Sequence, residues 1–163
     1  MIFCDLPYGR EFFSLYTDLG SFAARALKEE GGSLVTHILQ YDMLNVGRSL
    51  EDRGLTFSWP IAVRYSGAKA KFHSSQVIIC WKLLGWFTRG REPKLENYFD
   101  DFVQSEAPKK EYHKWTQSPM YAEYLHAYLS CNYMVIDLPL AILLSIRKME
   151  GLSHRMLPNP HMK

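Results

Sequence analysis

Four consecutive residues near the start of the chain, Asp5, Leu6, Pro7 and Tyr8, combine groups that can act on an aromatic amine. The Asp5 carboxylate and the backbone carbonyl of Leu6 or Pro7 can each accept a hydrogen bond from one amino group. Together they help turn its nitrogen lone pair towards an electrophile. The proline fixes the turn and so directs the carbonyl, and the tyrosine can stack on a base flipped out of a helix. These residues are suited to transferring an electrophilic group to an exocyclic amine.

The same four residues have an ordinary structural interpretation, in which Asp5 caps a following helix and Pro7 and Gly9 shape the bend. Their position favours the chemical interpretation. The apolar run from Met1 to Cys4 predicts a buried strand that ends at Asp5. In open α/β sheets, ligands bind at the carboxyl ends of the strands. We therefore expect Asp5, Pro7 and Tyr8 in a surface cleft at that edge, near the loop after Leu39.

The rest of the chain alternates predicted helices and strands, which indicates an α/β domain with a mostly parallel sheet. Apolar spacing and turn residues predict helices over 10–30, 42–53 and 112–130, strands over 33–39, 56–65, 76–83 and 133–136, and an exposed connection over 95–111. The strands over 56–65 and 76–83 form a terminal antiparallel pair joined by a basic loop. We expect the first strand to lie beside the 33–39 strand and under the first helix.

This order of elements resembles the S-adenosylmethionine-dependent DNA amino-methyltransferases, in particular permuted members whose catalytic D-P-P-Y precedes the methyl-donor motif. The resemblance covers about residues 2–137 and includes Trp81-Lys82 and W-T-Q-S-P from Trp115 to Pro119. It implies a three-layer Rossmann-like sheet and methyl transfer to adenine N6 or cytosine N4 of duplex DNA with a flipped base. It also implies that Asp5, Leu6, Pro7 and Tyr8 are catalytic. The donor, S-adenosylmethionine, is then expected near Tyr8 and Asp137.

The sequence departs from that family in two places. Leu6 replaces the first proline of the motif. After Asp137 the family has D-P-F-x-G-x-G, whereas this chain has D-L-P-L-A-I, and none of its ten glycines lies between Arg91 and Glu150. Glycines let a backbone approach a large cofactor. We therefore expect a catalytic and target-binding region over 1–137 with an incomplete sheet, a divergent tail over 138–163, doubtful donor binding and little or no activity alone.

Two expectations concern what this chain does instead. The apolar stretch after Asp137 predicts a helix over 141–150 that packs on the domain or across a homodimer interface. A complementing methyltransferase subunit is another possible partner. The alternative function is a non-catalytic nucleic-acid-binding or protein-interaction module that keeps the methyltransferase fold.

Composition limits the other functions. The 163 residues are 47% hydrophobic and carry a net charge of +2, which indicates one globular domain without general affinity for nucleic acid. Phosphate contacts are expected at the basic loop with Arg64, Lys69, Lys71 and His73, for which a solvated hairpin loop is an equal alternative. The histidines lack metal-ligand spacing, so no metal site is expected. Three unpaired cysteines, no signal peptide and no apolar run of spanning length predict a cytoplasmic protein without membrane contact.

Overall fold

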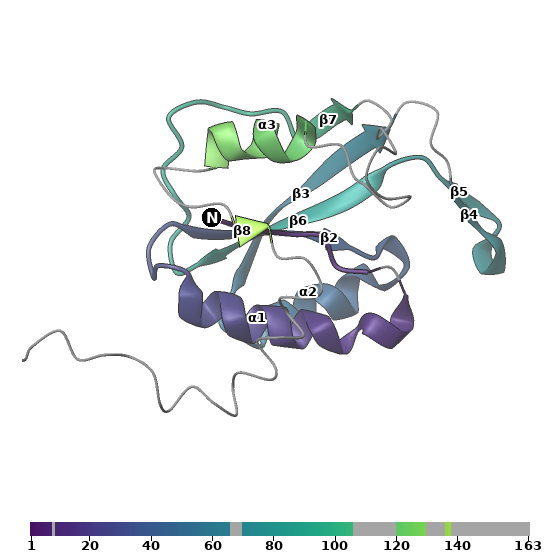
Figure 1. Cartoon of the computed structure of the whole chain (residues 1–163), viewed down its shortest axis with the longest axis horizontal. Coiled ribbons are helices and arrows are strands. Elements are labelled where there is room, and N and C mark those ends of the chain that lie inside the picture. Colours follow the sequence, from purple (N-terminus) through teal and green to yellow (C-terminus); the bar gives the residue numbers. More distant parts are fainter. Residues whose placement is uncertain (8, 66–69, 106–119, 130–135, 138–163) are drawn as a thin grey trace, which may run out of the picture.

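The computed structural model describes residues 1–7, 9–65, 70–105, 120–129 and 136–137. Figure 1 shows three layers, with α1 and α2 on one face of a central sheet and α3 on the other. The helices are α1 (Ser14–Ala26), α2 (Met43–Glu51) and α3 (Met120–Leu129), with short 3-10 helices at Arg10–Phe12, Gln40–Asp42 and His73–Ser75. The strands are β1 (Ile2–Cys4), β2 (Gly32–Ile38), β3 (Thr56–Tyr65), β4 (Ala70–Phe72), β5 (Val77–Ile79), β6 (Lys82–Arg89), β7 (Phe102–Ser105) and β8 (Ile136–Asp137).

The main sheet has six strands in the order β7-β3-β6-β2-β1-β8. Neighbours β1 and β2, β1 and β8, and β3 and β7 are parallel, whereas β6 is antiparallel to both β2 and β3. Five strands therefore run in one direction and β6 runs against them. The predicted α/β class, the mostly parallel sheet and the antiparallel pairing of the 56–65 strand are confirmed.

The two faces of the sheet carry separate hydrophobic clusters, as a central sheet covered on both sides requires. On one face, Ile2 and Cys4 of β1 pack with Leu15, Tyr16 and Leu19 of α1. This packing confirms that β1 lies beside β2 and is covered by the first helix. On the opposite face, side chains from β1, β2, β3, β6 and β7 pack with Leu125 and Leu129 of α3.

The first helix is shorter than the sequence predicts. A 3-10 turn at Arg10–Phe12 precedes α1, and α1 ends at Ala26 because Leu27 is extended and turns its side chain into the core. Gly31, with φ +76, then reverses the chain into β2, a conformation that favours glycine. Gly54, with φ +86, follows α2 and confirms the predicted stop there.

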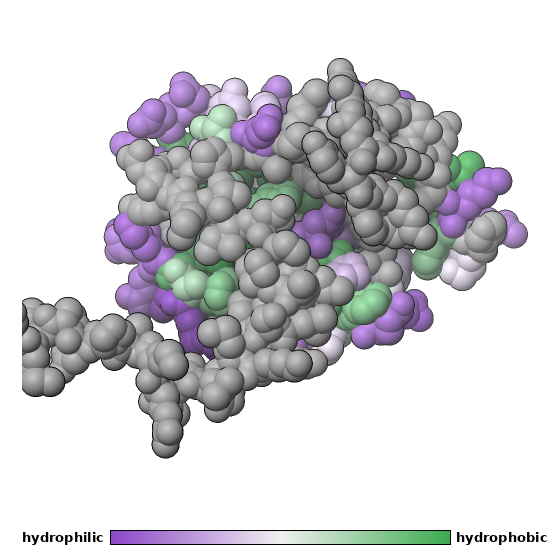
Figure 2. All heavy atoms as spheres, in the orientation of Figure 1, coloured by the Kyte–Doolittle hydropathy of each residue, from purple (hydrophilic) through white to green (hydrophobic). Residues whose placement is uncertain are grey.

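Two other predicted segments differ from the structure. The expected strand over 76–83 is divided: Val77–Ile79 pairs with Ala70–Phe72 in a separate hairpin, and the buried strand begins at Lys82. This hairpin projects beyond the sheet in Figure 1, and its residues Val77 and Ile78 are exposed beside exposed Lys71. Green and purple surfaces accordingly meet at that end of Figure 2. The 95–111 connection is also partly structured, because β7 pairs with β3 and buries Val103 and Ser105.

Candidate functional site at the carboxyl edge of the sheet

The turn that begins at Asp5 lies between two parallel neighbours. Cys4 at the end of β1 pairs with Thr36 of β2, and Phe3 pairs with Asp137 of β8. The carboxyl ends of these three strands therefore meet at one edge of the sheet. This register places the backbone of Asp137 beside Phe3, two residues before Asp5. The side chain of Asp137 and residues 138–163, including the expected helix over 141–150, lie outside the described residues.

Asp5 forms an ion pair with Lys82. The Lys82 ammonium donates a hydrogen bond to Asp5 Oδ2 at 2.6 Å, and the two side chains are 5% and 20% exposed. Lys82 reaches this edge because β6 runs antiparallel to its neighbours, so its first residue lies where the parallel strands end. Burial lowers the pKa of Lys82, and the neighbouring Asp5 carboxylate opposes that shift.

The second carboxylate oxygen of Asp5 has a different environment. Oδ1 is buried and accepts no hydrogen bond from the described part of the chain. The following 3-10 helix and α1 both begin without a side-chain cap, so Asp5 does not act as a helix cap. Buried acceptors are nearly always satisfied by a partner, a water or a ligand. Oδ1 is therefore an acceptor whose hydrogen-bonding capacity the described residues leave unused.

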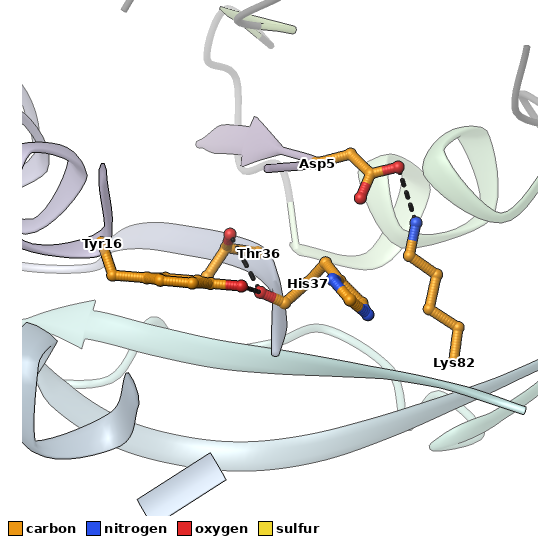
Figure 3. A network of polar contacts seen from close by, with 5 residues as sticks. All are labelled: Asp5, Tyr16, Thr36, His37 and Lys82. Atoms are coloured by element: carbon orange, nitrogen blue, oxygen red, sulfur yellow. Dashed lines mark hydrogen bonds and ion pairs between the residues drawn. The ribbon is translucent and has the colours of Figure 1, made fainter. Parts of the chain in front are cut away.

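A buried polar network lies beneath this ion pair, and Figure 3 shows how its members lie. The Tyr16 hydroxyl donates to the backbone carbonyl of His37 at 3.0 Å. Burial, and secondarily the Asp5 charge, raises the pKa of Tyr16 well above its ordinary value. Burial and the Lys82 charge lower the pKa of His37 to about 2. At neutral pH, Tyr16 is thus a proton donor and His37 is uncharged.

The other predicted catalytic residues are only partly described. Leu6 is fully buried in the cluster beneath α1, and Pro7 is half-buried beside it in sequence. Tyr8 lies outside the described residues, so the stacking role and the predicted cleft around it stay predictions. Among the tryptophans considered for base stacking, Trp86 is buried as expected for a core residue, while Trp81, directly before Lys82, is 41% exposed.

The predicted phosphate contacts lie near the same edge. Arg64, at the carboxyl end of β3, and Lys71, in β4, are both exposed and flank residues 66–69. Lys69 and the side chain of His73 lie outside the described residues.

The projecting hairpin is held against the loop after β2 by aromatic and polar contacts. The Tyr41 and Phe72 rings stack with centroids 4.9 Å apart. The Arg10 guanidinium lies over the Tyr41 ring, 5.5 Å from its centroid. Gln40 also donates a hydrogen bond to the Trp81 carbonyl at 2.7 Å. The basic hairpin is therefore docked beside the carboxyl edge.

The sequence did not predict the site roles of three residues, Lys82, Tyr16 and His37. Lys82 entered only as part of the family resemblance. A usable signal was present, because Lys82 directly precedes the continuous apolar run Leu83–Phe87, where a lysine needs a partner if the strand is buried. Tyr16 carried no such signal, because its spacing fits the apolar stripe of α1.

Two features of the described residues bear on other functions. No group of three or more histidine, cysteine or carboxylate side chains that could hold a metal occurs among them. None of the helices in the described ranges is long and apolar enough to cross a membrane.

Comparison with known proteins places the fold. No family model matches the sequence, and no curated protein matches it. Among solved structures, that of the M1.HpyAVI–SAM complex has a TM-score of 0.64 at 18% identity, with 91% of this chain and 78% of that chain covered. A second structure of M1.HpyAVI has a TM-score of 0.60 at 13% identity, with 89% and 71% covered. The chain has a methyltransferase-like fold.

That assignment confirms the family resemblance at the level of the fold. The order of motifs, the state of the donor half and the role of each site residue stay predictions.

Proposed function

We propose that this chain is the catalytic and target-binding part of an S-adenosylmethionine-dependent DNA amino-methyltransferase that acts on adenine N6 or cytosine N4. The adjacency of β1 and β8 carries the proposal. It sets Asp137, the last described residue before the expected donor segment, beside Phe3, two residues before Asp5. An amine acceptor and a donor-binding segment need this proximity, because the reacting nitrogen and methyl carbon must come into contact.

In this proposal Asp5 holds the target amine. Its unpartnered Oδ1 accepts one amine hydrogen, and a carbonyl of the Leu6-Pro7 turn accepts the other. The two bonds fix the amine and direct its lone pair out of the ring plane. Tyr8 stacks on the flipped base. Pro7 keeps the turn in place, since its fixed φ restricts the backbone.

S-adenosylmethionine supplies a methyl group on a sulfonium centre when it is bound. The residues after Asp137 fit it poorly, because Leu138, Leu140 and Ile142 stand where the family has its glycine-containing turn. We therefore propose weak donor binding and little activity for the chain alone. A second copy of the chain or a complementing methyltransferase subunit would then complete the donor site.

The distribution of charge supports an approach of DNA at the carboxyl edge rather than on the α3 side. Arg64 and Lys71 are exposed there. A groove of about 580 Å³ on the α3 side is instead lined by acidic Glu92, Glu96 and Asp101, which repel phosphates. We place this DNA-modifying function in the cytoplasm, in keeping with the cysteine usage of the sequence.

The test separates recognition of the amine from turnover. Duplexes with randomised flanks carry one unpaired adenine or, as the matched control, one unpaired purine that lacks the amine. We expect about tenfold tighter binding of the adenine duplex, as a hydrogen bond to a charged group provides, and loss of this preference in Asp5→Asn. Equal binding of both duplexes by the unmodified chain favours the non-catalytic module.

Donor binding is measured separately by calorimetric titration with S-adenosylmethionine, with and without the adenine duplex. Weak or absent binding is expected for the chain alone. Saturable tight binding together with methylation of unmethylated DNA would show that the segment after Asp137 forms an intact donor site.

A further inference from the structure

The ion pair between Lys82 and Asp5 gives the two oxygens of the carboxylate different surroundings. Oδ2 receives the Lys82 ammonium at 2.6 Å, a short distance for a charge-assisted hydrogen bond. Oδ1 is buried and accepts nothing from the described part of the chain. Lys82 begins β6, and Figure 3 shows its side chain reaching towards Asp5. The carboxylate is thus held from one side only.

We infer that Lys82 is a positioning residue that fixes the orientation of the Asp5 carboxylate, so that Oδ1 alone is presented to the target amine. The inference rests on the proposed function and adds a residue to it. Lys82 does not touch the base in this account. It acts through Asp5, whose side chain would otherwise rotate about two bonds and present either oxygen.

A purely stabilising role accounts poorly for the pair. Burying two charges costs several kcal/mol per ion, and replacing a buried pair by apolar residues is often neutral or stabilising. Lys82 is 5% exposed and begins a strand whose following residues are apolar and buried, so a leucine would suit that position in the core. A lysine here serves a purpose other than stability, and its contact with Asp5 identifies which residue it serves.

The other members of the buried network are uncharged, which leaves Lys82 as the cation in it that pairs with Asp5. His37, a buried base of the network, is neutral because burial and the Lys82 charge disfavour its protonated form. Tyr16 keeps its proton and uses it on the His37 carbonyl. Lys82 is therefore the cation of this network that pairs with the Asp5 carboxylate.

The experiment compares Lys82→Met, which keeps length and removes the charge, with Lys82→Arg, which keeps the charge. Lys94→Met is the matched control, because Lys94 is exposed and follows the opposite end of β6. The first readout is the adenine-over-purine preference described above. The second is the rotamer distribution of Asp5, from three-bond couplings of its methylene protons, which needs neither DNA nor donor.

We expect Lys82→Met to lower the preference for adenine about tenfold while binding of the purine duplex is unchanged. Its Asp5 couplings should average over rotamers. Lys82→Arg and Lys94→Met should keep one rotamer and most of the preference. If circular dichroism shows that Lys82→Met does not fold, Lys82→Gln, which retains a neutral donor, replaces it. We then expect the same loss of adenine preference and of a single Asp5 rotamer, but smaller.

Two results would overturn the inference. Lys82→Met with a single Asp5 rotamer and an unchanged preference shows that the pair is structural, and a stronger preference shows that Lys82 masks the carboxylate. If the unmodified chain does not distinguish adenine from purine, the proposed function fails, and the couplings still decide whether Lys82 fixes Asp5. The two failures are therefore distinguishable.

Discussion

The two ends of β6 each carry a cation, and the two cations have different surroundings. Lys82 begins the strand, is buried, and pairs with Asp5 at 2.6 Å. Arg89 ends it and approaches Glu29 at 3.6 Å, where the Glu29 side chain is 85% exposed. Arg89 also donates a hydrogen bond to the Leu27 carbonyl at 2.6 Å.

The difference separates a pair that the fold surrounds from a pair that water surrounds. Solvent screens the Arg89–Glu29 pair, so its contribution to stability is small. At that end the chain is held by its backbone, because Gly31 donates to the Arg91 carbonyl at 3.0 Å. At the Lys82 end both charges are enclosed by the protein. Removal of either partner leaves the other charge buried without a counter-charge, which lowers the free energy of unfolding.

The largest effect is expected from Lys82→Met, which leaves the Asp5 carboxylate without its counter-charge. We expect a loss of about 3 kcal/mol in the free energy of unfolding, measured by urea denaturation. The double variant Asp5→Asn/Lys82→Met should recover most of this loss, since neither partner is then charged. Equal destabilisation of the single and double variants would mean that lost packing of the lysine stem causes the effect.

The sequence predicts the Asp5 turn better than it predicts the partner of Asp5. The turn at Asp5 follows from an apolar strand and D-x-P-Y, because both signals are local. The partner of Asp5 is 77 residues away in the chain, and the two residues meet only through the pairing of the strands in the sheet. The expected strand over 76–83 therefore missed the start of the buried strand. Both Val77–Ile79 and Leu83–Phe87 read as apolar runs, and tertiary pairing decides which of them is central.

Gly90→Ala tests whether the backbone holds the Arg89 end. Gly90 has φ +67, and an added Cβ would clash with the Glu29 carbonyl oxygen, a backbone atom that cannot rotate away. We expect about 2 kcal/mol of destabilisation from strain and displacement of this turn. Gly47→Ala is the matched control, since nothing lies within 4 Å of the added methyl group and the residue is helical. It should keep or raise stability.

His37 gives the Lys82 end a pH dependence. Its folded pKa of about 2 lies below the ordinary value of 6.5, so the unfolded chain binds a proton first as pH falls. The stability contribution is complete above pH 6.5 and is lost below it, with a limiting slope of about 1.4 kcal/mol per pH unit. Denaturation between pH 8 and pH 5 should show this slope in the unmodified chain.

The matched variant for that titration is His37→Gln, which has no group that titrates in this range. Its stability should change less between pH 8 and pH 5 than that of the unmodified chain. An identical pH profile in both proteins would mean that carboxylates, rather than His37, set the acid sensitivity of this end.

The smallest effect is expected from Glu29→Gln at the other end of β6. The exposed carboxylate gains little from Arg89 in water, so the variant should unfold within about 0.3 kcal/mol of the parent, with no difference at high salt. Arg89→Met should cost more, about 1 kcal/mol, because it removes the donor to the Leu27 carbonyl. The contrary result is a salt-dependent loss of stability in Glu29→Gln as large as that in Arg89→Met. That result would mean that the exposed pair contributes to stability as the buried pair does. The contrast between the two ends of β6 would then rest on the backbone alone.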